Sequence, residues 1–233
     1  MSVDVSDVGP GPVRVIRFDS GERNVLDPST LGELTSQLRR ANDLECGALV
    51  LTGAGSAFSD GVDLDLFEAW DDGHVAELAR ALDGALAEHF NLPMTTVAAI
   101  NGDATDHGCV LACACDWRLA VPEARIGTTR PGGGLGVSSM VAQIMRSANG
   151  MHAAPLLVGA RTNSGEAAVT RNLVHELEEP DALEARAIAL AYEIASIPWS
   201  FEDPGGVHDV GAEMLELMTL VNPTGWGEPT TVE

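Results

Sequence analysis

The sequence predicts an α/β fold with a functional site at the ends of its strands. Short apolar runs rich in Val, Ile, Leu and Ala occupy residues 13–18, 47–52 and 95–100, and each is followed by a polar or glycine-bearing turn and a helical pattern. Loops that follow parallel strands gather at one edge of a sheet, so chemistry is expected there. The 233 residues suffice for one substantial core. We expect a core over 1–197 and a C-terminal helical appendage over 198–233, for oligomer contacts.

The first elements are indicated by local signals. Val13–Phe18 (VRVIRF) alternates apolar and basic residues, which predicts a half-exposed strand. Asp27-Pro28-Ser29 predicts a helix start, and leucines at 31, 34 and 38 continue it at helical spacing. Gly47–Thr52 predicts a second, buried strand that leads into a glycine-bearing loop over residues 53–63, a common kind of binding loop.

The later elements follow the same logic. Val75–Phe90 has one apolar face and predicts a helix that Pro93 ends, and the buried strand Thr95–Ile100 comes next. Beyond it we expect two strands, Trp117–Ala120 and Ala124–Gly127, and then a loop over Thr128–Gly136 with three consecutive glycines. Helices are expected over Val137–Met145 and 212–221, with a helix start at Ser164–Ala168. Two further segments, 153–158 and 181–197, are apolar.

The segment Asn101–Asp116 (NGDATDHGCVLACACD) is where the chemistry is expected. A polar turn containing Asp103, Asp106 and His107 opens a helix of Cys, Val, Leu and Ala. Helix starts present unpaired N–H groups and a positive dipole end, which suit a negative oxygen. We expect at least one of the two aspartates to cap this helix, whereas either could instead orient the histidine.

Charge and cysteine usage narrow the function. The chain has 35 acidic residues against 13 cations, all of them Arg, and a net charge of −22. Such a surface repels nucleic acid and anionic membranes. This composition is expected for a protein of a cytoplasm with a high salt concentration, or for one encoded by a GC-rich genome, in which Arg replaces Lys. No secretion signal or membrane span is recognisable, so we expect a cytoplasmic protein. We expect the four cysteines to be buried core residues and not to form a disulfide framework or a metal site.

Four separated stretches carry a family resemblance. They are RNVLDPSTLGEL from Arg23, ALVLTGAGSAFSDGVDL from Ala48, VAAINGDATDHGCVLACACDWRLAVPEARIG from Val97 and LLVGARTNSGEAAVTRNLV from Leu156. On these motifs the chain resembles the crotonase (enoyl-CoA hydratase/isomerase) superfamily. The resemblance implies a spiral of ββα units, a homo-trimer or hexamer, and a pair of backbone N–H groups, the oxyanion hole, that stabilises the enolate of an acyl thioester. The coenzyme A thioester would be the substrate, with no bound cofactor and no metal.

The resemblance also assigns residues. The oxyanion donors would be the N–H groups of Val62 and His107, and the pocket would include Gly61, Gly108, Val110 and Thr129. Hydratases of the family use two glutamates, and those positions hold Val110 and Arg130 here, so a two-carboxylate hydratase mechanism is not supported.

Three residues are candidates to replace the glutamates: His107, Asp106 and Arg130. Imidazole titrates near neutrality, and His107 would lie beside the oxyanion hole, so it is a candidate acid or base. The alternative, given equal weight, is that its side chain only fills the space beside a position where the family usually has glycine. Arg130 would bind a carboxylate or phosphate, or it would form a buried ion pair.

Three functions stay open on the sequence. The first is an enzyme that stabilises an enolate of an acyl-CoA-type thioester, as an isomerase, hydrolase or atypical hydratase. The second is a C–C bond hydrolase acting on a β-diketone without coenzyme A, because the run NG-x-A-T-x-H is similar to a pattern in that branch of the superfamily. The third is a non-catalytic acyl-CoA-binding subunit, which the missing glutamates favour.

Overall fold

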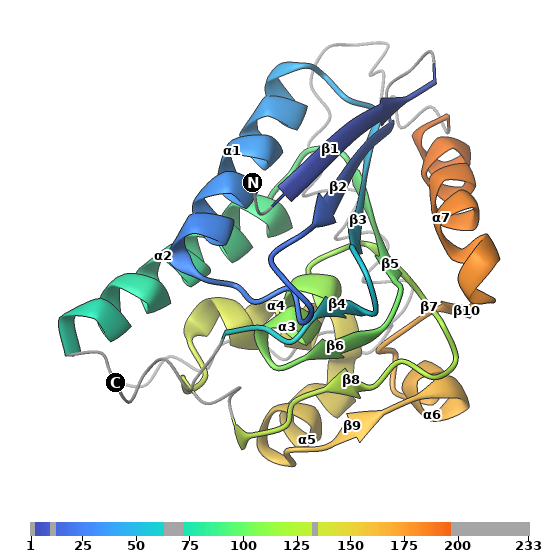
Figure 1. Ribbon diagram of the computed structural model, residues 1–233. Helices are drawn as coiled ribbons and strands as arrows, with labels where there is room; N and C mark the ends of the chain where they lie inside the picture. The colour runs from blue at the N-terminus through green and yellow to red at the C-terminus, as the bar shows by residue number, and fades with distance from the viewer. Residues whose placement is uncertain (1–2, 10–12, 63–71, 132–134, 197–233) are drawn as a thin grey trace, which may run out of the picture. The chain divides into compact units, whose positions relative to one another are not determined.

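A computed structural model of the chain describes residues 3–9, 13–62, 72–131 and 135–196 (Figure 1). These residues belong to the first of two units into which the chain divides, Met1–Ile197. The expected appendage over 198–233, its helix over 212–221 and the three glycines at 132–134 lie outside the described residues. The boundary at residue 197 therefore stays a prediction.

Ten strands and seven α-helices have described residues. The strands are β1 Val3–Val8, β2 Val13–Phe18, β3 Ala48–Gly53, β4 Ala57–Ser59, β5 Thr95–Ile100, β6 Asp103–Thr105, β7 Trp117–Ala120, β8 Ile126–Gly127, β9 Thr162–Asn163 and β10 Glu176–Leu177. The helices are α1 Pro28–Asp43, α2 Asp72–Phe90, α3 His107–Cys113, α4 Ser139–Asn149, α5 Ala153–Val158, α6 Gly165–Thr170 and α7 Pro180–Ala195, with a 3₁₀ turn at Gly150–His152.

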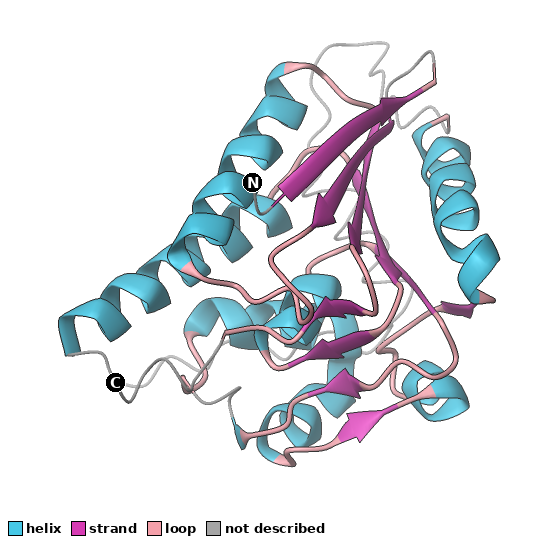
Figure 2. Ribbon diagram, in the orientation of Figure 1, coloured by secondary structure: helices cyan, strands magenta, loops and turns pink. Residues whose placement is uncertain are grey.

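The strands form two sheets. One has six strands in the order β1-β2-β3-β5-β7-β10, parallel except for the β1–β2 pair. The other has the order β4-β6-β8-β9, with β4, β6 and β8 parallel and β9 antiparallel. Helices α1 and α2 pack together on one side of the large sheet, and α7 contacts β3 and β5 on the other (Figure 2). The predicted α/β class is confirmed.

The longer predicted elements are confirmed with small shifts at their ends. Helix α1 begins as expected, because the Asp27 carboxylate accepts a hydrogen bond from Thr30 N at 2.7 Å and Pro28 occupies the first turn. Strand β5 spans the expected residues, whereas β8 contains only the last two residues of the expected Ala124–Gly127. The polar turn expected at residues 101–107 contains a strand, β6.

The prediction of a half-exposed strand at Val13–Phe18 is wrong. Arg14 is buried, because β1 pairs antiparallel with β2 and brings Asp7 opposite it. Arg14 Nε and Nη2 each donate to one oxygen of the Asp7 carboxylate at 2.8 Å. The bidentate pair lowers the pKa of Asp7, chiefly through these hydrogen bonds.

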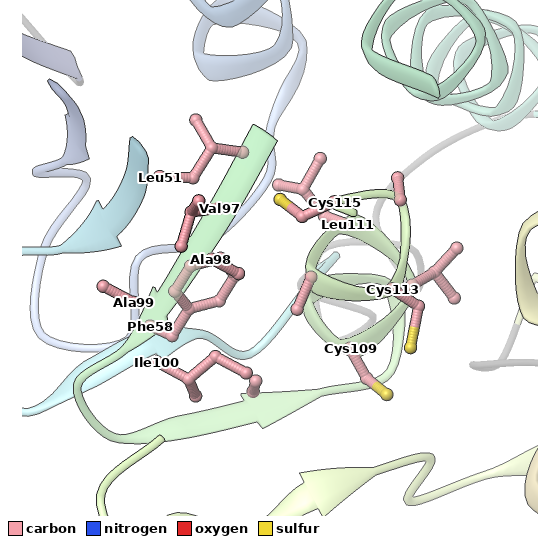
Figure 3. Packing of buried hydrophobic residues seen from close by; sticks show 14 of the residues in the cluster. Leu51, Phe58, Val97, Ala98, Ala99, Ile100, Cys109, Leu111, Cys113 and Cys115 are labelled. Atoms are coloured by element: carbon pink, nitrogen blue, oxygen red, sulfur yellow. The ribbon is translucent and has the colours of Figure 1, made fainter. Parts of the chain in front are cut away.

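The hydrophobic core reaches the candidate site along α3. Every residue of this helix is buried; Leu111, with Cys115 just after the helix, lies toward the small and β-branched side chains of β5, whereas Cys109 and Cys113 lie on the side of the helix away from that strand (Figure 3). All four cysteines are buried and free, as expected for core residues. The packing leaves α3 little freedom to move, so its first residues are held in a fixed place.

Candidate functional site

Two backbone segments meet at the candidate site, one at Gly61 and the other at His107 and Gly108. A Cβ atom placed on Gly61 would lie 2.7 Å from the amide nitrogen of His107. Gly61 also has a φ of +76°, which side-chain-bearing residues rarely adopt. A Cβ on Gly108 would lie 2.0 Å from the carbonyl oxygen of Ser59. Glycine is therefore required at both positions for the segments to approach each other.

Strands β4 and β6 bring these segments together. They run parallel, so their carboxyl ends lie at the same edge of the small sheet and deliver residue 61 beside residue 107. The Ser59 hydroxyl donates to Asn24 O at 2.7 Å and accepts from Gly61 N at 3.1 Å. These bonds tie the loop to the segment that precedes α1.

The peptide group between Gly61 and Val62 has a defined orientation. Leu26 N donates to the Gly61 carbonyl at 2.8 Å. Because the peptide is planar and trans, the N–H of Val62 points away from Leu26. Neither this N–H nor that of His107 has a hydrogen-bond acceptor among the described residues. The two groups meet a basic requirement of a paired-donor site, namely free N–H groups on adjoining segments.

His107 is the first residue of α3 and its side chain is 2% exposed. Its Nδ1 atom has no hydrogen-bond partner among the described residues. Burial lowers the pKa of the imidazole, while the carboxylates of Asp106 and Asp83 act in the opposite direction. The ring is therefore neutral near pH 7.

Asp106 does not cap α3, and neither does Asp103, so that prediction is wrong. Asp106 precedes the helix with φ 51° and ψ −119°, and its side chain makes no capping bond. Its carboxylate instead accepts from Thr129 N at 2.8 Å, from the Thr129 hydroxyl at 2.5 Å and from Arg130 N at 3.4 Å. Asp103 lies on β6 and forms an ion pair with Arg125.

The two positions assigned to glutamates differ in their surroundings. Val110 is buried in the hydrophobic core. Arg130 is exposed and forms no ion pair with a described residue, so a buried ion pair is not its role. Its backbone, with that of Thr129, holds the Asp106 carboxylate.

The structure therefore unites the sequence candidates in two groups. Gly61, Val62, His107 and Gly108 form one, and Asp106, Thr129 and Arg130 form the other, joined through the adjacent residues 106 and 107. Sequence reasoning missed Ser59 and Asp83. A three-residue strand end carries too short a pattern to reveal Ser59, and Asp83 looks like any polar residue on the exposed face of a helix.

No group of three His, Cys, Asp or Glu side chains within the described ranges could hold a metal ion. None of the helices in those ranges is long and apolar enough to cross a bilayer.

Two mostly parallel sheets, with a glycine-dependent junction of backbone segments at the strand ends, define a protein of the crotonase fold. A model of the enoyl-CoA hydratase/isomerase family matches residues 10–202, and the chain belongs to this family. The crystal structure of an enoyl-CoA hydratase from Mycobacterium ulcerans is similar, with a TM-score of 0.76 and 26% identity over 83% of this chain and 85% of that one.

Curated relatives agree with this membership. The chain is 31% identical to (E)-benzylidenesuccinyl-CoA hydratase of Thauera aromatica, over 88% of this chain and 81% of the relative. It is 41% identical to a probable enoyl-CoA hydratase of Mycobacterium tuberculosis over 104 residues. That second alignment covers 44% of this chain and only 40% of the relative.

Proposed function

We propose that the chain stabilises the enolate of an acyl-CoA-type thioester between the N–H groups of Val62 and His107. The observation that carries the proposal is the approach of the two segments, with the position of a Gly61 Cβ only 2.7 Å from His107 N. Two further observations support it: neither N–H has a hydrogen-bond acceptor among the described residues, and the chain belongs to the family. Each such donor contributes about 3 kcal/mol to the stabilisation of a developing oxyanion.

Asp106 is our candidate for the group that moves the proton. It immediately precedes the second oxyanion donor, and the Arg130 amide donates to it, so its carboxylate lies beside the backbone of one position where the resemblance implies a glutamate. The Thr129 amide and hydroxyl fix its orientation, and a general base needs such positioning. The buried neutral imidazole of His107 is the alternative base, and the exposed Arg130 would contact an anionic part of the substrate.

A single carboxylate favours a proton-shuttle reaction over hydration. A carboxylate can remove the proton from the carbon next to the thioester carbonyl and return it to another carbon of the resulting dienolate. The result is a shifted double bond with no atom gained or lost. Hydration needs a second group to orient water. We therefore place double-bond isomerisation first among the thioester reactions.

A β-diketone hydrolase without coenzyme A is the second candidate. It is favoured by the adjacency of a buried, neutral histidine to a held carboxylate, because C–C bond hydrolysis also passes through an enolate that needs the same two donors.

The experiment offers the protein three ligands in parallel: a 3-enoyl-CoA, a saturated acyl-CoA of equal length, and a linear β-diketone. Isomerisation of the first, followed by the absorbance of the conjugated thioester, and calorimetric binding of the second would support the proposal. Cleavage of the diketone with no binding of either thioester would overturn it in favour of the hydrolase. Binding of both thioesters without any turnover would leave a non-catalytic acyl-CoA-binding protein.

A further inference from the structure

A cavity of about 370 Å³, apart from the proposed oxyanion site, lies beside helix α5 and strand β9. Residues from α5, β9 and the adjoining turns line it: His152, Pro155, Leu156, Val158, Gly159, Arg161, Asn163 and Arg171. None of the residues of the proposed oxyanion site is among them. In Figure 1, α5 and β9 lie next to β8 at the outer edge of the small sheet.

The charge of this cavity is opposite to that of the chain. The protein carries a net charge of −22, yet no carboxylate lines the cavity and two of its thirteen arginines do. Neither Arg161 nor Arg171 forms an ion pair with a described residue, whereas six of the other eleven arginines do: Arg14, Arg17, Arg23, Arg39, Arg125 and Arg186. Unpaired guanidinium groups so placed are suited to bind an oxyanion in a bidentate manner.

Asn163 supplies an independent sign of a missing partner. Asn163 lines the same cavity, the residue is 7% exposed, and its buried Nδ2 atom has no hydrogen-bond partner among the described residues. Buried amide donors are nearly always paired in folded proteins, so an unpaired one marks a place where a ligand or water completes the structure.

The rest of the wall is apolar. Pro155, Leu156 and Val158 contribute hydrocarbon surface, and the Val158 residue is 69% exposed although it is large and hydrophobic. Met151, at the adjacent 3₁₀ turn, is 87% exposed. Exposed apolar side chains beside cationic groups are typical of a site for a ligand with one charged end and one apolar end.

We propose that this cavity binds an amphiphilic oxyanion, a carboxylate or phosphate group carried on a short apolar chain. Arg161 and Arg171 hold the oxyanion beside Asn163, and the apolar chain lies against Leu156 and Val158. The proposal does not depend on the reaction at the oxyanion site, because the two sites share no lining residue.

The test is calorimetric titration of the full chain with hexanoate, with hexyl phosphate, and with hexanol as the uncharged control. The variant is the double substitution Arg161→Gln and Arg171→Gln. Its matched control is Arg146→Gln, which removes an exposed arginine of α4. We expect saturable binding of at least one of the two anions, no binding of hexanol, and at least about tenfold weaker binding in the double variant alone.

Hexanoate and hexyl phosphate distinguish the two head groups, and tighter binding of either one supports the site. Equal binding of hexanol, or anion affinity that the double variant retains, would overturn the proposal. A change in oligomeric mass of the double variant, with no anion bound by the unaltered protein, would assign the cavity to a contact between chains and would also contradict it.

Discussion

The carboxylate of Asp106 accepts two hydrogen bonds from Thr129, one from its N–H at 2.8 Å and one from its hydroxyl at 2.5 Å. Asp106 holds a φ of +51° with ψ −119°, a conformation that favours glycine. A non-glycine residue in such a region costs about 1–3 kcal/mol. The bonds to Thr129 therefore keep a strained aspartate directly before the proposed oxyanion donor of His107.

Two substitutions of Asp106 distinguish the energetic cost of its backbone strain from the contribution of its hydrogen bonds. Asp106→Ala keeps the strain and loses the bonds, whereas Asp106→Gly loses both. We expect the alanine variant to be less stable than the glycine variant by about 1–2 kcal/mol, measured as the free energy of unfolding in urea. Equal stability of the two variants would show that the conformation at residue 106 is not strained.

The proton carrier is identified by comparing two conservative variants. Asp106→Asn keeps the size of the side chain and removes its basicity, so turnover of a confirmed thioester substrate should fall by at least about 100-fold. His107→Gln keeps the backbone N–H and should lower turnover by less than about 10-fold. The reverse ranking of the two rates would assign the proton transfer to the imidazole.

Gly108 tests the close approach of the two segments. An alanine Cβ there would lie 2.0 Å from the backbone carbonyl of Ser59, which has no side-chain rotation to relieve the clash. We expect Gly108→Ala to destabilise the fold by about 3 kcal/mol or more and to abolish activity. Gly84→Ala is the control, because the added Cβ would meet nothing within 4 Å apart from neighbouring residues of its own helix, α2. That variant should be neutral or more stable by up to about 1 kcal/mol.

Local signals made much of the fold predictable. Asp27 and Pro28, followed by regularly spaced leucines, predict α1, and the apolar run Thr95–Ile100 predicts β5. Strands β4, β6, β9 and β10 have two or three residues each, too few for a periodic pattern. Arg14 was misjudged because its burial depends on pairing with β1, which an isolated strand pattern does not contain.

The candidate site was only partly predictable for the same reason. The importance of Gly61 and His107 came from a family resemblance, and spacing alone indicated just a polar turn before a helix. The hydrogen bonds from Thr129 to Asp106 join residues 23 positions apart, and they replace the local cap that sequence reasoning favoured. A capping preference is a local tendency, and here a tertiary contact outweighs it.

His89 gives the fold a pH dependence that can be measured. Burial lowers its pKa to about 4, so the folded state keeps the ring neutral. Below pH ~6.5 the unfolded chain binds a proton at this residue that the folded chain does not bind. The free energy of unfolding therefore carries no penalty from His89 above that pH, and it declines as the pH falls towards 4. The loss is on the order of 3 kcal/mol.

The variant His89→Gln isolates this effect from the many titrating carboxylates. Between pH 7.5 and 4.5 its free energy of unfolding should decline less than that of the unaltered protein. Parallel pH curves for the two proteins would show that His89 is not a buried neutral histidine.

The proposed function requires that the N–H groups of Val62 and His107 stabilise an enolate. Exchange at the carbon next to the thioester carbonyl measures that intermediate directly, whatever product the enzyme finally releases. The protein is incubated with butyryl-CoA in D₂O, and deuterium at this carbon is followed by mass spectrometry. We expect deuterium incorporation that the Asp106→Asn variant loses, while both proteins bind the thioester. Bound butyryl-CoA that gains no deuterium from the unaltered protein would contradict it.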